Sequence, residues 1–265
     1  MAKKQQIKPK KNTYTMNNSL VSYYLLIMFT FFELFLSNGF AHARTDKYWF
    51  FVITSSAFVA AIIIFTISAY CDKTMPKEDR LSLQTPFFDM SVTDYAFIAF
   101  FLFACISTIF SQYKYDSLTG DMGRNNGLIL LACYLAIYII ISRFYYYKEY
   151  VLVAFMIGGC IVSALAILNF FFIDPLGILE DLEPWYAMNF GSTIGNKNYI
   201  AIYMCIFLAA ALMMFIIYKQ LYMKVLCAVA VCFAYCGLLT AGSNSGFIGL
   251  FAMLFAMIAV CIRKP

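Results

Sequence analysis

The stretch VLCAVAVCFAYCGLLTAGSNSGFIGLFAMLFAMIAVCI, residues 225–262, decides the fold class of this chain. It holds 38 residues without a formal charge. As one α-helix it would be about 57 Å long, because an α-helix rises 1.5 Å per residue. That length is nearly twice the hydrocarbon core of a bilayer, which is roughly 30 Å thick. The turn-like cluster within the stretch is GSNSG at 242–246. The pattern therefore predicts two membrane-spanning helices joined by a turn at that point.

Six further apolar runs precede this stretch. They cover residues 20–36, 49–69, 95–110, 127–141, 151–173 and 199–218. Each is near the length of about 20 residues with which a helix crosses a membrane. We therefore predict an all-α, polytopic membrane protein with about eight transmembrane helices. Its expected layout is a basic tail over 1–19 and a single transmembrane domain over 20–265.

The first run could instead belong to a cleaved signal peptide, because Ala41-His42-Ala43 has the form of a cleavage site. The run at 20–36 is, however, longer than the roughly 7–15 apolar residues of a signal peptide. Further spans also follow it. We therefore expect the first run to be retained as a span.

The composition excludes a water-soluble domain. Hydrophobic residues make up 63% of the 265 residues and charged residues 12%, whereas soluble domains are about 45–50% apolar and about 25% charged. The net charge of +5 comes from basic residues in the tail and in short connectors, which does not indicate a nucleic-acid partner. The nine cysteines lie within or at the end of apolar runs. We expect them to serve as small packing residues, with no metal and no cofactor.

The basic residues also predict an orientation. Fourteen of the 19 Lys and Arg residues lie in the tail and in alternate connectors, and five in the other connectors. Cytoplasmic connectors carry the excess of Lys and Arg. Both termini are therefore predicted to be cytoplasmic. The outer face then carries loops at 38–48, 111–126 and 174–198 and the turn at 242–246.

Two outer segments have the residue types of a polar binding site. The first is GDMGRNNGL, residues 120–128, in which Arg124 and Asn125 lie at the start of a span. The glycines around them let the backbone approach a ligand closely. A guanidinium offers paired donors that suit a diphosphate. The alternative is that Arg124 anchors the helix at the interface or pairs with Asp121.

The second segment is GSTIGNKNY, residues 191–199, which leads into the expected span at 199–218. Lys197 and the free N–H groups of a helix start favour anion binding, and the amides of Asn196 and Asn198 suit sugar hydroxyls. The alternative is a capped helix start without a ligand.

Three other features have weaker functional interpretations. Glu33 is the one formal charge inside an expected span, and such residues are functional candidates. Here it lies near the outer end, where snorkelling or pairing with Arg44 is the competing interpretation. His42, the one histidine, lies near Asp46 in a predicted outer loop and lacks a nucleophile to activate. Gly158-Gly159 predicts close helix packing.

Three segments together resemble the superfamily of bacterial O-antigen ligases and O-antigen polymerases. They are 120–128 with its Arg-Asn-Asn-Gly-Leu run, 191–199 with its Gly-Asn-Lys-Asn run, and 240–246. Their order, their spacing and their places at outer span ends agree with that family. The resemblance covers roughly residues 94–262.

The resemblance implies a metal-independent glycosyltransferase of the bacterial cytoplasmic membrane. Such enzymes take a glycan from an undecaprenyl-diphosphate carrier on the outer face and pass it to a glycan, lipid, protein or wall acceptor. By this analogy Arg124 and Lys197 would bind the diphosphate, and Asn196 and Asn198 would shape the donor pocket. Asn125 and Ser243 complete the expected substrate-binding set, and the catalytic residues are not identified.

The chain departs from the family in two ways. Family members carry more spans and a large outer loop with Arg and His after the part matched here. They also often have Arg beside Ser in the turn that here reads Ser243-Asn244-Ser245. We therefore expect this chain to be the N-terminal portion of such a protein, without its catalytic loop. Two alternatives stay open: a transporter or flippase of lipid-linked glycans, and a non-catalytic scaffold of envelope assembly.

Overall fold

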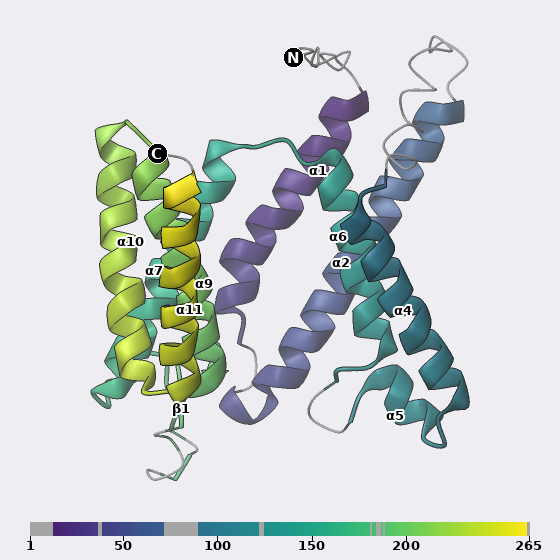
Figure 1. Cartoon of the computed structure of the whole chain (residues 1–265). Coiled ribbons are helices and arrows are strands. Elements are labelled where there is room, and N and C mark those ends of the chain that lie inside the picture. Colours follow the sequence, from purple (N-terminus) through teal and green to yellow (C-terminus); the bar gives the residue numbers. More distant parts are fainter. Residues whose placement is uncertain are drawn as a thin grey trace. The chain divides into compact units, whose positions relative to one another are not determined.

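Figure 1 shows the computed structural model of the chain. It describes residues 13–36, 39–71, 90–121, 125–180, 182–183, 187 and 189–263. In this part the chain is helical apart from connecting segments and one short hairpin. The residues group into two compact units, each of which is described below by itself.

Unit 1 lies within residues 1–25 and 48–148, and unit 2 within 26–47 and 149–265. The helices of unit 1 are most of α1 (Thr13–Ile27), most of α2 (Gly39–Cys71), α4 (Val92–Phe110), α5 (Lys114–Thr119) and α6 (Leu128–Phe144). Unit 2 contains η1 (Met28–Phe32), α7 (Glu149–Phe170), β1 (Phe190–Gly191), β2 (Gly195–Asn196), α9 (Lys197–Ile217), α10 (Leu221–Ala241) and α11 (Asn244–Arg263).

The described helices confirm a multi-pass α-helical membrane protein. Five of them are long and apolar enough to cross a bilayer: Ala43–Cys71, Val92–Phe110, Glu149–Phe170, Lys197–Ile217 and Leu221–Ala241. Leu128–Phe144 and Asn244–Ile258 are apolar but shorter. Large apolar side chains of α4 are exposed, with Phe103 at 71% and Phe110 at 82%. Lipid is the solvent that accommodates such a surface. The predicted count of about eight spans is not confirmed.

The first expected span and the loop after it differ from the prediction. Residues 20–36 are not one α-helix, because α1 ends at Ile27 and the π-helix η1 continues to Phe32. The Thr30 hydroxyl donates to the carbonyl of Leu26 at 2.7 Å, and such bonds compete with the regular helix pattern. The loop expected at 38–48 is helical from Gly39 on. It lacks an internal Gly or Pro that would stop the helix.

Unit 2 is a bundle in which α10 packs against both α7 and α9. Small residues on α10, including the fully buried Ala230 and Ala234, let the helices approach closely. A Cβ on Gly159 would lie 2.3 Å from the ring of Phe207, and a Cβ on Gly158 would lie 2.3 Å from the carbonyl oxygen of Phe29. The close packing predicted for this glycine pair is therefore confirmed.

The turn predicted within 225–262 is also confirmed. Helix α10 ends at Ala241, and Gly242 adopts the left-handed conformation with a φ of 57°, which costs glycine little. Helix α11 begins at Asn244. Its Gly246 lies so close to α9 that a Cβ there would be 2.8 Å from that of Ala201.

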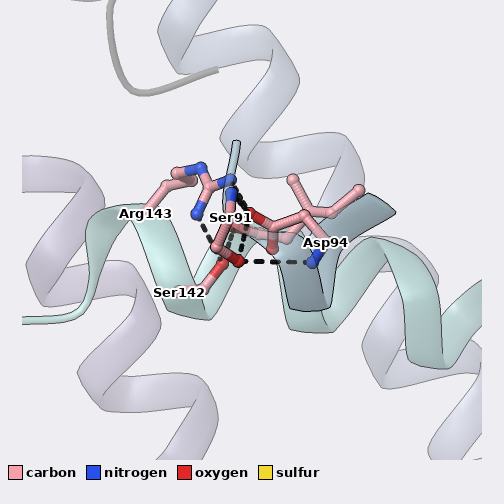
Figure 2. Close-up of polar contacts among 5 residues, drawn as sticks. Ser91, Asp94, Ser142 and Arg143 are labelled. Atoms are coloured by element: carbon pink, nitrogen blue, oxygen red, sulfur yellow. Dashed lines mark hydrogen bonds and ion pairs between the residues drawn. The ribbon is translucent and has the colours of Figure 1, made fainter. Parts of the chain in front are cut away.

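In unit 1 a buried ion pair joins the start of α4 to the end of α6 (Figure 2). Ser91 and Asp94 form a capping box at the N-terminus of α4. The guanidinium of Arg143 donates to the same Asp94 carboxylate at 2.6 Å. The Asp94 side chain is 1% exposed and that of Arg143 is 12% exposed. The pair therefore fixes where these two helices meet.

Candidate functional site

Four helix ends and the hairpin meet at one end of unit 2. Helices α7 and α10 end there, and α9 and α11 begin there. The Ser243 hydroxyl, which follows α10, donates to Asn198 Oδ1 in the first turn of α9 at 2.7 Å. Ser243 is 4% exposed and also shares a hydrogen bond of 2.7 Å with Ser245. The 242–246 turn is thus joined to the 191–199 segment by side-chain hydrogen bonds.

The hairpin pairs Phe190 with Asn196 and Gly191 with Gly195. Its tip is buried and held by three hydrogen bonds. The N–H of Ser192 donates to Asn169 Oδ1 at 2.7 Å, and the Ser192 hydroxyl donates to the carbonyl of Val162 at 2.8 Å. The Thr193 hydroxyl donates to the carbonyl of Glu33 at 2.6 Å. These bonds offset the cost of burying a polar loop and fix the start of α9.

A cavity of about 430 Å³ opens beside the hairpin. Its walls are largely apolar and include Phe170, Phe172, Leu179 and Ile200. The polar residues of its lining are Asn169, Lys197 and Thr240. Small-molecule sites combine apolar walls with a few polar groups in this way, and their volumes are about 300–1,000 Å³. The cavity has the composition of a site for an amphiphilic ligand.

Among the described residues that line this cavity, Lys197 is the basic one, and its main chain is already engaged. Its N–H donates to the carbonyl of Asn189 at 3.0 Å. The N–H of Asn198 donates to the side chain of Asn196, the N-cap of α9, at 2.9 Å. The capped helix start is therefore confirmed. Because these N–H groups are occupied, an anion would be met by the Lys197 ammonium rather than by the first amides of the helix.

The structure brings together four of the six predicted site residues: Asn196, Lys197, Asn198 and Ser243. Asn125 lies in unit 1, where it adopts a positive φ of 53°. Arg124 lies outside the described residues. The glycines on either side of it have a local role, since a Cβ on Gly120 or on Gly127 would lie 2.2 Å from the backbone of the same loop. Loop closure, rather than approach to a ligand, accounts for these two glycines.

Asn169 is a site residue that the sequence analysis missed. It is 6% exposed on α7, accepts from Ser192 and lines the cavity. A single amide near the end of an apolar run was the available signal, because a buried amide needs partners. Ser192 and Thr193 were quoted as part of a motif, but their burial follows from contacts with distant residues.

The structure also bears on Glu33, but it does not describe the side chain of His42. Glu33 is 8% exposed in unit 2, which does not fit a side chain that snorkels into a solvated interface. Pairing of Glu33 with Arg44 stays a prediction. The side chain of His42 lies outside those that the structure describes.

Compared with models of known families, with curated proteins and with solved structures, the chain gives no match. The resemblance to O-antigen ligases and polymerases stays a prediction from the three segments named above.

Proposed function

We propose that this chain binds an undecaprenyl-diphosphate-linked glycan and acts in transferring that glycan to an acceptor, as O-antigen ligases and polymerases do. The observation that carries the proposal is the cavity at the hairpin end of unit 2. Among the described residues, its lining combines apolar residues with the basic residue Lys197 and with Asn169. A lipid diphosphate needs both kinds of surface, because its chain is apolar and its head group is anionic.

The chemistry assigned to this end of unit 2 is electrostatic. In glycan transfer the diphosphate leaves with increasing negative charge, and a fixed cation stabilises that charge. The Lys197 ammonium would supply part of this stabilisation. The Thr240 oxygen, whose proton is donated to its own helix, would accept a hydrogen bond from the ligand. Asn169 would hold the cavity wall, because its amide bonds to Ser192, Ile173 and Asp174. Asn196 and Ser243 keep the start of α9 and the 242–246 turn in position. Arg124 and Asn125 remain predicted contributors.

The proposal includes a topology in the bacterial cytoplasmic membrane. It has eight spans, with both termini cytoplasmic, as the 14-to-5 division of basic residues favours. In that topology the cavity opens to the outer face. The carrier lipid presents its glycan there, and acceptors are reached from that side.

Glycan transfer by a cell or membrane preparation containing the full-length protein tests the proposal. Lys197→Ala should reduce transfer about tenfold to a hundredfold, because a charge-assisted hydrogen bond contributes about 1.5–3 kcal/mol. Lys219→Ala is the matched control, since Lys219 is exposed in the connector between α9 and α10. Equal transfer by both variants would contradict the proposal. Movement of labelled lipid-linked glycan across liposomes without transfer would favour the transporter.

A further inference from the structure

A second polar site lies in unit 2, around Glu33. This residue follows the π-helix η1 directly and is 8% exposed. A Cβ on Gly158 would lie 2.9 Å from its Oε2 atom, so the carboxyl group lies against the backbone of α7. Single π-helical turns occur often at functional sites, and ionisable residues inside membrane proteins are functional candidates.

Two buried polar atoms at this site lack a hydrogen-bond partner within the described part of the chain. They are Oε2 of Glu33 and the hydroxyl oxygen of Tyr203 on α9. The two side chains nevertheless interact electrostatically with each other. Buried polar groups in folded proteins are usually hydrogen-bonded, so two unpartnered atoms on interacting side chains are an exception.

The nearby ammonium of Lys47 does not supply the missing bond. Its Nζ atom donates to the carbonyls of Phe32 and Glu33 at 3.3 Å and 3.0 Å, and it lies 5.5 Å from the centre of the Phe32 ring. The ammonium is thus bonded to the main chain rather than to the carboxyl group. A buried carboxylate without a hydrogen-bonded ion pair is costly.

We propose that Glu33 and Tyr203 form a proton-binding site inside unit 2, and that the Glu33 carboxyl holds the proton at neutral pH. A neutral carboxylic acid has one O–H donor, and a tyrosine oxygen accepts. A proton on Oε2 removes the cost of burying a charge on this 8% exposed residue, and the acid O–H can donate to the Tyr203 oxygen. When the proton leaves, the Tyr203 hydroxyl donates to Oε2 instead, so the same pair serves both protonation states.

The groups facing this site come from several elements. Lys47 lies at the end of the unit 2 part of α2, Tyr203 on α9, and Cys160 on α7 interacts with Tyr203. The hairpin contributes Thr193, whose hydroxyl bonds to the Glu33 carbonyl and not to its carboxyl group. The proton-binding site is thus joined to the hairpin beside the cavity. The proposal for this site does not depend on whether the cavity binds a glycan.

Infrared difference spectroscopy of the full-length protein tests this proposal. The carbonyl stretch of a protonated carboxylic acid should be present at neutral pH, should disappear in Glu33→Gln, and should persist in Glu183→Gln, an exposed control. Transfer to heavy water should shift the band, because the proton exchanges. Tyr203→Phe removes the donor that stabilises the Glu33 carboxylate. The carboxylic-acid band of this variant should therefore persist to higher pH than that of the wild type.

A spectrum without an acid band sensitive to Glu33→Gln would overturn the proposal. A band that does not shift in heavy water would indicate a sealed structural acid and would also overturn it. If Glu33→Gln does not fold, chemical modification of the wild-type protein tests the proposal instead. A protonated carboxyl group adds across a C=N bond of the apolar reagent dicyclohexylcarbodiimide: its oxygen bonds to the carbon, and its proton passes to the nitrogen. The reagent should modify Glu33 at neutral pH, and modification of exposed carboxyls alone would contradict the proposal.

Discussion

The Ser243 hydroxyl donates to Asn198 Oδ1 at 2.7 Å across 45 residues of sequence. This bond joins two of the three segments on which the family resemblance rests. Ser243 is buried and Asn198 is exposed, so the bond lies at the edge of the protein interior. It fixes the 242–246 turn against the helix that carries Lys197.

Ser243→Ala should lower stability by about 0.5–1.5 kcal/mol, the usual contribution of a hydrogen bond. Thermal unfolding in detergent measures the difference. Thr108→Ala is the control, because the Thr108 hydroxyl bonds only to a carbonyl one turn back on its own helix, that of Ala104 at 2.9 Å. A smaller loss in Ser243→Ala than in Thr108→Ala would show that the bond between segments contributes little.

The ion pair of Figure 2 predicts a larger effect. Arg143→Ala leaves the Asp94 carboxylate without its guanidinium, with the N–H and hydroxyl of Ser91 as its remaining donors, and removing one partner of a buried pair is destabilising. The free energy of unfolding in detergent should fall clearly more than in a control variant. Lys114→Ala removes an exposed cation from the same unit and should change stability by less than about 1 kcal/mol. Similar losses in the two variants would mean that the pair is not stabilising.

The glycine pair on α7 makes a graded prediction. Alanine at Gly158 would place its Cβ against a backbone oxygen, and alanine at Gly159 would place it against the buried ring of Phe207. Overpacking costs about 1–3 kcal/mol, and we expect the larger loss at Gly158 because a backbone cannot change rotamer. Gly191→Ala, where the nearest atom would be 3.6 Å away, should be tolerated. Equal stabilities of all three variants would contradict this packing.

The proposed orientation predicts labelling from one side only. In a variant whose native cysteines are replaced, Leu176→Cys should react with an impermeant thiol reagent added to intact cells, because residue 176 is exposed and lies in the predicted outer loop. Lys219→Cys, in a predicted cytoplasmic connector, should react only after the membrane is opened. The reverse pattern would invert the topology and turn the cavity toward the cytoplasm.

Much of the fold could be predicted from the apolar runs. The length of 225–262 required a turn, and GSNSG marked its place, because glycine there adopts a conformation that other residues avoid. The early start of α4 could also have been found, since Ser91-Val92-Thr93-Asp94 is the pattern of a capping box. Apolar periodicity does not distinguish a π-helix from an α-helix, so the division after Ile27 was not predictable from it.

The candidate site was predictable only in part. Lys197 and the two asparagines beside it stand in one short motif, and Ser243 stands in another, so local sequence was enough to find them. Asn169 and Glu33 are each joined to the hairpin, at Ser192 and Thr193, by hydrogen bonds across 23 and 160 residues of sequence. Such contacts follow from helix packing, and one sequence does not specify which apolar faces meet.

The most direct test of the proposed function is binding of a polyprenyl diphosphate to the purified full-length protein in lipid nanodiscs. A photoreactive analogue should crosslink to cavity residues near Phe170 and Ile200, and Lys197→Gln should weaken binding about tenfold or more, while Lys219→Gln leaves it unchanged. Equal binding by both variants, or crosslinks confined to the lipid-facing surface, would contradict the assignment of this cavity to a lipid diphosphate.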